Sequence, residues 1–332
     1  MTPIVQNIND VDFVASLTRR YGTGVLSELL KDRTTKNNII WADREYVELG
    51  TGYAPYDEIT IAKISDRRVI EPRVVKSIDQ QAWRTKESAE VFTPSWLCKQ
   101  MVDCMDDAFF GEAPAAFEDG AETGLTDNRL QKLGESELWK AYVDNRLLEI
   151  TCGEAPFVCS PYDATTGDFV PVDERIGFLD RKLRVVKRFA ESYEDWLAWA
   201  KRALESSYGY EYQGDNLLIA RINTFNTFAD YLQDAWGKEL EEEDAKYVAR
   251  VISWNLWQMD GLRDCVPSKW DIPEAEDPQM SMFDLEGFWV VEETETKPGS
   301  VQDEQEQSGV AQLCEIKDWR SGKKQTFASL KG

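Results

Sequence analysis

The segment from Leu148 to Phe157 constrains the fold of this chain more than any other stretch of the sequence. Leu147-Leu148-Glu149-Ile150 is predicted to be a short buried strand, and Gly153 and Ala155 follow it in a predicted tight turn. A turn of small residues at the carboxyl end of a parallel strand lets a ligand approach the backbone closely. The segment therefore predicts an α/β fold with a ligand site at one edge of a parallel sheet, where Glu149 can meet a cation or a hydrogen-bond donor.

Two further predicted strands also end in acidic residues. Tyr208-Gly209-Tyr210-Glu211 ends one, and Trp257-Gln258-Met259-Asp260 ends the other. A carboxylate at Glu211 can accept hydrogen bonds from both hydroxyls of a ribose, and one at Asp260 can accept from an adenine amino group. A single acid of this kind is more often a solvated or capping residue. Three in order favour a ligand that contains a nucleoside.

The remaining pattern divides the chain into four parts. We expect an N-terminal helix and mixed strand segment over 1–90, a ligand-binding core over 91–270, an acidic linker or disordered insertion over 271–310, and a C-terminal strand and tail over 311–332. The other predicted elements are a helix over 9–31 capped by Asp10 or Asp12, short strands and turns over 37–90, a helix from Thr93 and Pro94 to Cys104, a surface loop over 111–135, helices over 173–206, 216–236 and 241–258, and strands over 288–291 and 311–316.

The net charge of −23 argues against a nucleic-acid partner only if the acids are spread evenly, which they are not. Residues 101–150 hold 12 acidic and 4 basic side chains, and residues 271–310 hold 12 acidic and 1 basic. Neutral or basic segments therefore remain elsewhere, notably Arg181 to Arg188 and Arg67 to Lys76.

The chain has no histidine, which excludes Ser-His-Asp hydrolysis and zinc sites of the HExxH type. Its six cysteines form no CxxC pair, and the first ten residues resemble no secretory signal, so we expect reduced thiols in a cytoplasmic protein. The sequence contains no run of 18 apolar residues, so we expect no membrane span. An enzyme of this composition must use carboxylates, lysine, tyrosine, amides or a cofactor.

The segment Glu90-Val91-Phe92-Thr93-Pro94-Ser95-Trp96, followed by the Leu148–Phe157 strand and turn, resembles the amino-methylating DNA methyltransferases, the modification subunits of restriction systems. The resemblance covers roughly residues 35–265 and the tail 311–330. It implies a class I S-adenosylmethionine-dependent methyltransferase fold, reduced or incomplete at its C-terminal strands, and methylation of adenine N6 in double-stranded DNA. It also implies a possible second restriction-modification subunit as partner. The residues that it places around the cofactor are Phe92, Thr93, Pro94, Glu149, Gly153, Ala155, Glu211 and Asp260.

The chain departs from the family at two places. The family's loop reads acid-Pro-x-x-Gly-x-Gly, whereas Ile150 and Ala155 stand here at the proline and the second glycine. A methyl group at Ala155 is expected to crowd the cofactor or to require a shifted backbone. The family's catalytic tetrapeptide, with two prolines before an aromatic residue, is absent, because the chain contains no Pro-Pro.

That tetrapeptide holds the target amine and stacks on the flipped base. Ser160-Pro161-Tyr162 resembles it but follows the cofactor loop directly, so we interpret it as a chance match. Asp318 and Trp319 are the better catalytic candidates, since they follow a predicted strand and come after Asp260 in order. A surface acid and a packing tryptophan remain the simpler interpretation of that pair.

Two other function classes stay open. A magnesium-dependent nuclease is one, because Glu315-Ile316-Lys317 matches the Glu-x-Lys part of a restriction-nuclease motif, with Asp303 or Asp284 as the further acid. A non-catalytic protein is the other: a methyltransferase-like binding or interaction subunit, or an acidic mimic of DNA. The missing tetrapeptide favours the binding subunit.

Overall fold

A computed structural model describes residues 7–65, 68–87, 90, 93–114, 123–268 and 312–331. The helices in these ranges are α1 (Phe13–Leu30), α2 (Ile61–Ser65), α3 (Ile78–Glu87), α4 (Ser95–Phe110), α5 (Asp127–Gly134), α6 (Leu138–Val143), α7 (Phe178–Phe189), α8 (Tyr193–Glu205), α9 (Gly214–Trp236) and α10 (Glu242–Asn255). The strands are β1 (Leu147–Glu149), β2 (Ser207–Glu211), β3 (Leu256–Gln258), β4 (Glu315–Lys317) and β5 (Lys324–Thr326). The predicted strand over 288–291 lies outside the described residues.

The centre of the described fold is a parallel sheet of β1, β2 and β3, in that order. Leu148 is aligned with Tyr208, and Tyr210 with Trp257. Helices α7 and α8 connect β1 to β2, and α9 and α10 connect β2 to β3, as parallel neighbours require. The predicted α/β architecture is therefore confirmed, together with the three strands that end in Glu149, Glu211 and the turn at Asp260.

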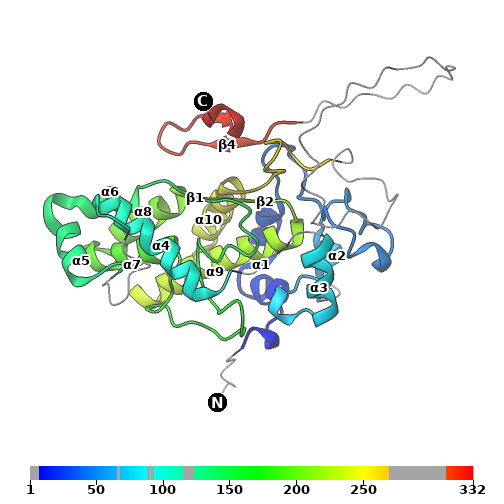
Figure 1. Cartoon of the computed structure of the whole chain (residues 1–332), viewed down its shortest axis with the longest axis horizontal. Coiled ribbons are helices and arrows are strands. Elements are labelled where there is room, and N and C mark those ends of the chain that lie inside the picture. Colours follow the sequence, from blue (N-terminus) through cyan, green and yellow to red (C-terminus); the bar gives the residue numbers. More distant parts are fainter. Residues whose placement is uncertain are drawn as a thin grey trace.

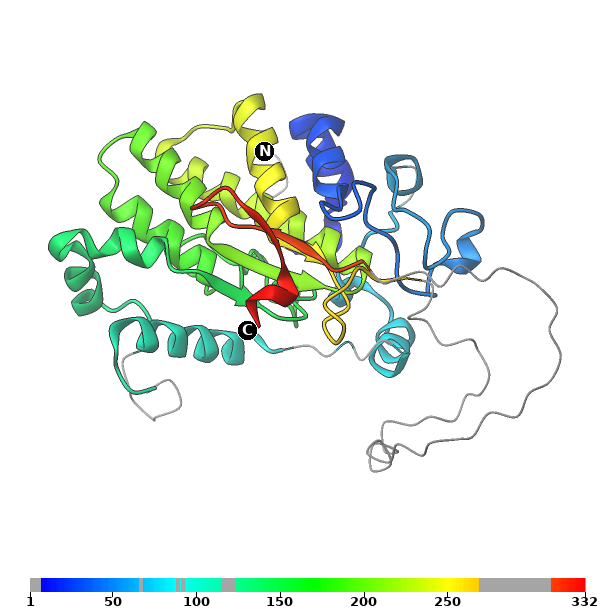
Figure 2. The same cartoon turned by 90° about the horizontal axis from the view of Figure 1, so that it is seen from above.

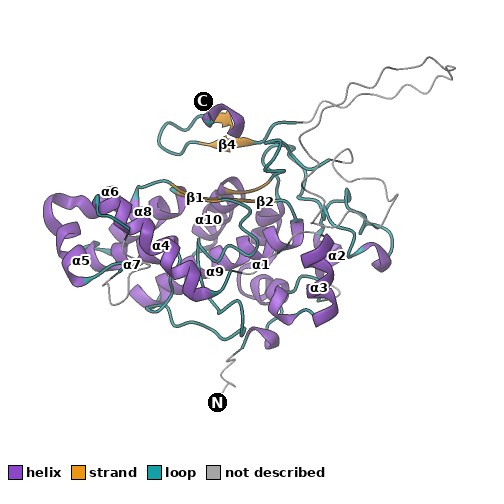
Figure 3. Cartoon of the chain, viewed as in Figure 1, coloured by secondary structure: helices purple, strands orange, loops and turns teal. Residues whose placement is uncertain are grey.

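The sheet lies between a layer of helices and the C-terminal hairpin of β4 and β5 (Figure 1). Figure 2 shows the hairpin crossing over the sheet from above. Side chains alternate along a strand, so Tyr210 and Trp257 face the hairpin, where they pack with Ile316 and Phe327. Figure 3 shows how small the share of strand is beside that of helix. None of the described helices is long and apolar enough to cross a membrane.

The N-terminal helix α1 is part of the same core and not a separate domain. It packs on α9 and α10, and its residues belong to the hydrophobic cluster that fills the helical layer. Asp12 caps it, as predicted, by accepting from the Ala15 N–H at 2.8 Å. The buried guanidinium of Arg221 on α9 then ties α1 to the sheet, because it donates to the carbonyls of Leu29 and Leu256.

Several predicted elements differ from the observed ones. Residues 37–90 contain isolated bridges and the helices α2 and α3 instead of regular strands, and helix-forming residues such as Gln, Ala, Lys and Glu fill α3. The stretch 173–206 breaks into α7 and α8, because Ser192 caps a new helix by accepting from the Asp195 N–H at 3.1 Å. The predicted loop over 111–135 contains α5.

The acidic block over 101–150 is largely internal in its helical part. On α4, Asp103 and Asp106 are buried and both pair with Arg181 of α7 at 2.5 Å. Asp107 is buried and pairs with Arg129 of α5 at 2.5 Å. These acids join three helices, so they add little negative charge to the surface.

Candidate functional site

The loop after β1 has the open backbone that its sequence predicts. Thr151, Gly153 and Ala155 have positive φ angles of 45°, 53° and 64°. A backbone of this kind alternates in handedness and forms a concave surface. The Cys152 N–H donates to the Tyr210 carbonyl at 2.7 Å and fixes the loop beside the end of β2. A Cβ placed on Gly153 meets no atom within 4 Å, so the loop faces open space at this residue.

The methyl group of Ala155 does not face that space, because the residue is fully buried and belongs to the hydrophobic core. Ala155 takes a left-handed conformation, at a cost of about 1–2 kcal/mol. Core packing on the methyl group offsets this strain.

Glu211, at the end of β2, closes the loop from the other side. Its carboxylate accepts from the Gly153 N–H at 2.8 Å and from the Gln213 N–H at 3.1 Å. Burial raises the pKa of Glu211, whereas these two backbone bonds lower it and nearby Asp215 and Glu90 raise it further. Each carboxylate oxygen keeps a lone pair, so Glu211 can still accept from a ligand beside Gly153.

Glu149, at the end of β1, supports the loop from below. Its carboxylate accepts from the N–H groups of Phe157 at 3.3 Å and Val158 at 3.0 Å, where the chain leaves the loop. Burial raises its pKa well above the usual range. Glu149 is thus held inside the loop as a structural acceptor, with 6% of its surface exposed.

Asp260 follows β3, at the same edge of the sheet. Its Oδ1 accepts from the Leu262 N–H at 2.9 Å, and its Oδ2 lies 3.8 Å from Arg263 Nε. The carboxylate therefore caps its own turn, with a second oxygen directed to solvent-exposed Arg263. Asp260 shares the carboxyl edge with Glu149 and Glu211, as predicted.

The segment that precedes α4 approaches the same edge. Cys98, in the first turn of α4, is buried, and burial raises the pKa of its thiol to about 12. The Glu149 carboxylate adds to this rise. Pro94, and not Thr93, occupies the N-cap position, without a side-chain bond. Thr93 and Pro94 directly precede α4, and the Cys98 thiol donates to the Thr93 carbonyl at 3.6 Å. Phe92 lies outside the described residues.

A buried ion-pair network that sequence reasoning missed lies next to Glu211. We call it the Asp215 network, and its members are Tyr46, Glu45, Lys76, Arg84, Glu90 and Asp215. Asp215 begins α9 and binds Arg84 Nη1 at 2.9 Å and Lys76 Nζ at 3.1 Å. Burial alone raises the pKa of Asp215, but these two cations hold it well below its usual range.

The Asp215 network joins segments that are far apart in the sequence. Lys76 and Arg84 come from the segment of residues 68–87, and Glu90 also accepts from Asn216 of α9 at 3.2 Å. In the sequence, Asp215 directly precedes the predicted helix over 216–236, and an acid at the N-terminus is favourable for any helix. The network sets the segment of residues 73–87 against the carboxyl edge of the sheet, because Arg73 N–H also donates to Glu154 at 2.6 Å.

Asp318 and Trp319 lie at the opposite edge. Asp318 pairs with Arg146, which directly precedes β1, at 2.9 Å. The Trp319 indole donates to Asn255, which directly precedes β3, at 2.7 Å. Both contacts are at the amino ends of the strands, on the order of 10 Å from the loop acids given the rise of a strand. The structure therefore separates this pair from the other predicted site residues.

The match at Ser160-Pro161-Tyr162 is part of the buried interior. Ser160 N–H donates to Asp180 at 2.9 Å, and the Tyr162 hydroxyl donates to Glu154 at 2.6 Å. Both residues are buried. These bonds fix the chain that follows the Gly153 loop, so both side chains have structural partners in the interior.

Glu315 and Lys317, the residues of the Glu-x-Lys match, lie on β4. Glu315 pairs with Lys36 at 3.7 Å. No group of three or more acidic, cysteine or histidine side chains in the described ranges could hold a metal ion. Asp284 and Asp303 lie outside those ranges. The six cysteines are all free thiols, as predicted.

Comparison of the chain with known protein families, with curated proteins and with solved structures gives no match. The chain is an α/β protein with a three-stranded parallel sheet among its described residues, and an open backbone loop and three acids, Glu149, Glu211 and Asp260, lie at the carboxyl edge of that sheet.

Proposed function

We propose that this chain binds S-adenosylmethionine at the carboxyl edge of its parallel sheet and transfers the methyl group to adenine N6 in DNA. In this role it serves as the modification subunit of a restriction system, with a second subunit as a possible partner. The observation that carries the proposal is the loop at Gly153, whose backbone faces open space while Glu211 binds its N–H.

The residues at this edge fit the cofactor. Its nucleoside hydroxyls need a carboxylate, which Glu211 offers, and its amino acid end needs a close backbone approach, which Gly153 permits. Asp260 lies beyond β3, where an adenine amino group would find an acceptor. When bound, the cofactor supplies a methyl group that its sulfonium activates for attack by an amine.

Each group of the chain has a definite task in this proposal. Glu149 keeps the loop in shape, Glu211 orients the ribose, and Thr93 with Pro94 covers the loop from the start of α4. The buried surroundings exclude water and strengthen these polar contacts.

A specific observation favours a second candidate, a cofactor-binding subunit without catalysis. Asp318 and Trp319 contact residues at the amino edge of the sheet, and the chain lacks the Pro-Pro that holds the target amine in the family. In this candidate, a partner subunit provides the residues that bind the target base.

Transfer of tritium from methyl-labelled cofactor to duplex DNA, with digestion to nucleosides, tests the proposal. We expect label in N6-methyladenine for the native chain and at least about a tenfold loss in Gly153→Val, because the added side chain fills the space beside the loop. If the native chain binds the cofactor but no label reaches the DNA, the second candidate is supported. If the native chain neither binds the cofactor nor labels the DNA, both candidate functions are overturned.

Gly237→Val is the matched control. Gly237 ends α9 with a φ of 64° and also has no atom within 4 Å of a placed Cβ. Both substitutions impose the same backbone strain, but Gly237 lies at the far end of the helix from Glu211. Equal losses of transfer in the two variants would show that strain, and not occupancy of the site, causes the effect.

A further inference from the structure

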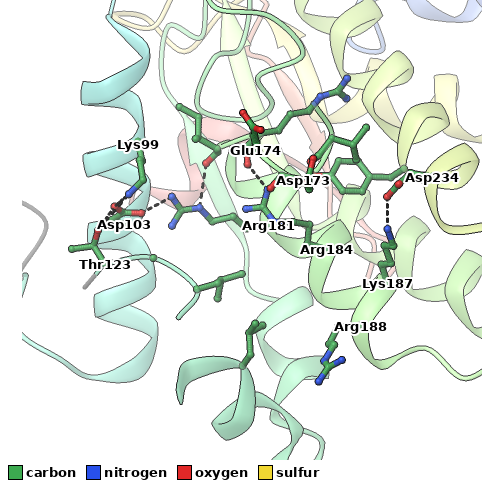
Figure 4. A pocket seen from close by; sticks show the side chains of 17 residues that line it. Lys99, Asp103, Thr123, Asp173, Glu174, Arg181, Arg184, Lys187, Arg188 and Asp234 are labelled. Carbon is green, nitrogen blue, oxygen red and sulfur yellow. Dashed lines mark hydrogen bonds and ion pairs between the residues drawn. The ribbon is translucent and has the colours of Figure 1, made fainter. Parts of the chain in front are cut away.

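A concave site lies away from the carboxyl edge. A cleft with a volume of about 620 Å³ opens between α4, α5, α7 and α9 (Figure 4). This volume is in the range of small-molecule sites. Its lining includes none of Glu149, Gly153, Glu211 and Asp260, so the proposed methyltransferase function does not use it.

The cleft is cationic although the chain is strongly acidic. Six basic and four acidic side chains line it, a balance of +2 against −23 for the whole chain. Both lysines of the lining have carboxylate partners: Lys99 pairs with Asp103 at 2.7 Å, and Lys187 pairs with Asp234 at 2.6 Å. Figure 4 shows both pairs at the rim. Two of the arginines also have carboxylate partners: Arg175 pairs with Asp230, and Arg181 pairs with Asp103 and Asp106. Arg184 and Arg188 are therefore the basic side chains of the lining that form no ion pair among the described residues.

Arg184 and Arg188 lie one turn apart on α7, and side chains at this spacing share a helix face. Arg184 is held by the carbonyl oxygens of Asp173, at 3.2 Å, and Arg175, which fix its guanidinium without cancelling its charge. Arg188 is exposed. Neither forms an ion pair with a carboxylate in the part of the chain that the structure describes.

The floor of the cleft is apolar. Leu125, Leu130, Val172 and Ile176 line it beside the guanidinium groups. Arginine binds phosphate oxygens through parallel N–H bonds, and a fixed guanidinium loses little entropy when it does so. An apolar floor next to the fixed guanidinium of Arg184 and the exposed one of Arg188 suits a molecule with both a ring and a phosphate.

We propose that this cleft binds a phosphate ester of nucleotide size, with the phosphate on Arg184 and Arg188 and the ring on the apolar floor. The phosphate comes either from a free nucleotide or from a strand of DNA. The cleft volume favours the free nucleotide, since it holds one such molecule and not a duplex.

Calorimetry with AMP and with inorganic phosphate, and fluorescence anisotropy with a short DNA duplex, test this inference. We expect AMP to bind the native chain and to bind Arg184→Gln/Arg188→Gln at least about tenfold more weakly. Arg188→Gln alone should weaken AMP about threefold, and because Arg188 is exposed this variant is expected to fold normally. If the native chain binds the duplex but not AMP, and the same variants lose duplex binding, the result supports phosphate binding in the cleft with DNA as the source of the phosphate.

Arg19→Gln is the control, because Arg19 is an exposed arginine on α1. It should leave AMP affinity unchanged. No binding of AMP, phosphate or duplex at about 5 mM, or equal binding by the native chain and the double variant, overturns the inference. S-adenosylmethionine affinity, measured in parallel, should not change in the double variant, so the two proposals fail independently.

Discussion

At the scale of residues, buried charge is the main feature of this protein. Asp215 has no exposed surface and is neutralised by Arg84 and Lys76, while Arg221 is buried among carbonyls. Removal of one member of such a set leaves another charge unpaired in a poorly solvated place, which is costly. These residues should therefore control stability far more than the surface pairs do.

Asp215→Asn should lower the free energy of unfolding by about 3–5 kcal/mol, because Arg84 and Lys76 lose the carboxylate that balances them. Urea denaturation measures the change. Asp234→Asn is the control: its pair with Lys187 is exposed on both sides and should contribute less than about 1 kcal/mol. Similar losses in the two variants would contradict the role of the Asp215 network.

Cofactor affinity should fall as the pH is lowered, with a midpoint above the ordinary glutamate value of about 4.5. Burial, Asp215 and Glu90 raise the pKa of Glu211, and only the ionised form accepts bonds from two ribose hydroxyls. Affinity is therefore complete above the raised pKa and is lost as protons bind. Calorimetry from pH about 4.5 to 7 measures this. Glu211→Gln should remove the dependence, and an unchanged profile in that variant would contradict the assignment.

At the scale of elements, α3 is attached to the fold in an unusual way. Arg84 is fully buried in the Asp215 network, whereas Ile78 has 83% of its surface exposed and Trp83 has 36%. A helix whose apolar side chains face solvent gains little from packing. Arg84 is thus the buried anchor of α3 next to the proposed cofactor edge, while Thr85 and Gln80 add exposed hydrogen bonds to Arg73 and Glu45.

Arg84→Gln should release α3 without unfolding the core. We expect faster amide hydrogen exchange over residues 78–87, with unchanged protection in the middle of α9, because local opening is separate from global unfolding. Asp79→Asn, an exposed change in the same helix, should leave exchange unaltered. Equal acceleration in α3 and α9 would mean that Arg84 stabilises the whole fold instead.

The hairpin of β4 and β5 covers one face of the sheet through Phe327, which packs against Tyr210 and Trp257. Phe327→Ala should cost about 3 kcal/mol in urea denaturation, because it opens a cavity under the hairpin. Leu330→Ala, with 54% of the leucine surface exposed, should change stability by less than about 0.5 kcal/mol. A small effect of Phe327→Ala would show that the hairpin is not needed to cover the sheet.

At the scale of the whole molecule, the features that depend on local pattern were predicted from the sequence and those that depend on distant contacts were not. The strands ending in Glu149 and Glu211 and the turn after Asp260 follow from short sequence signals, and they meet because parallel strands share an edge. Arg84 and Asp215 lie 131 residues apart, and no local pattern indicates their contact.

The position of Asp318 shows the same limit. The sequence predicts a strand before it, and β4 is that strand. The strand lies across the face of the sheet and pairs with β5, however, and it does not extend the parallel edge. Asp318 is thus carried to the amino edge, beside Arg146.

Calorimetric titration of the native chain with S-adenosylmethionine tests the proposed cofactor site most directly. We expect binding of one cofactor per chain with a dissociation constant below about 1 mM, weakened at least about tenfold in Gly153→Val and unchanged in Gly237→Val. No heat of binding at millimolar cofactor, or an equal affinity in Gly153→Val, would contradict a cofactor site at the carboxyl edge of the sheet.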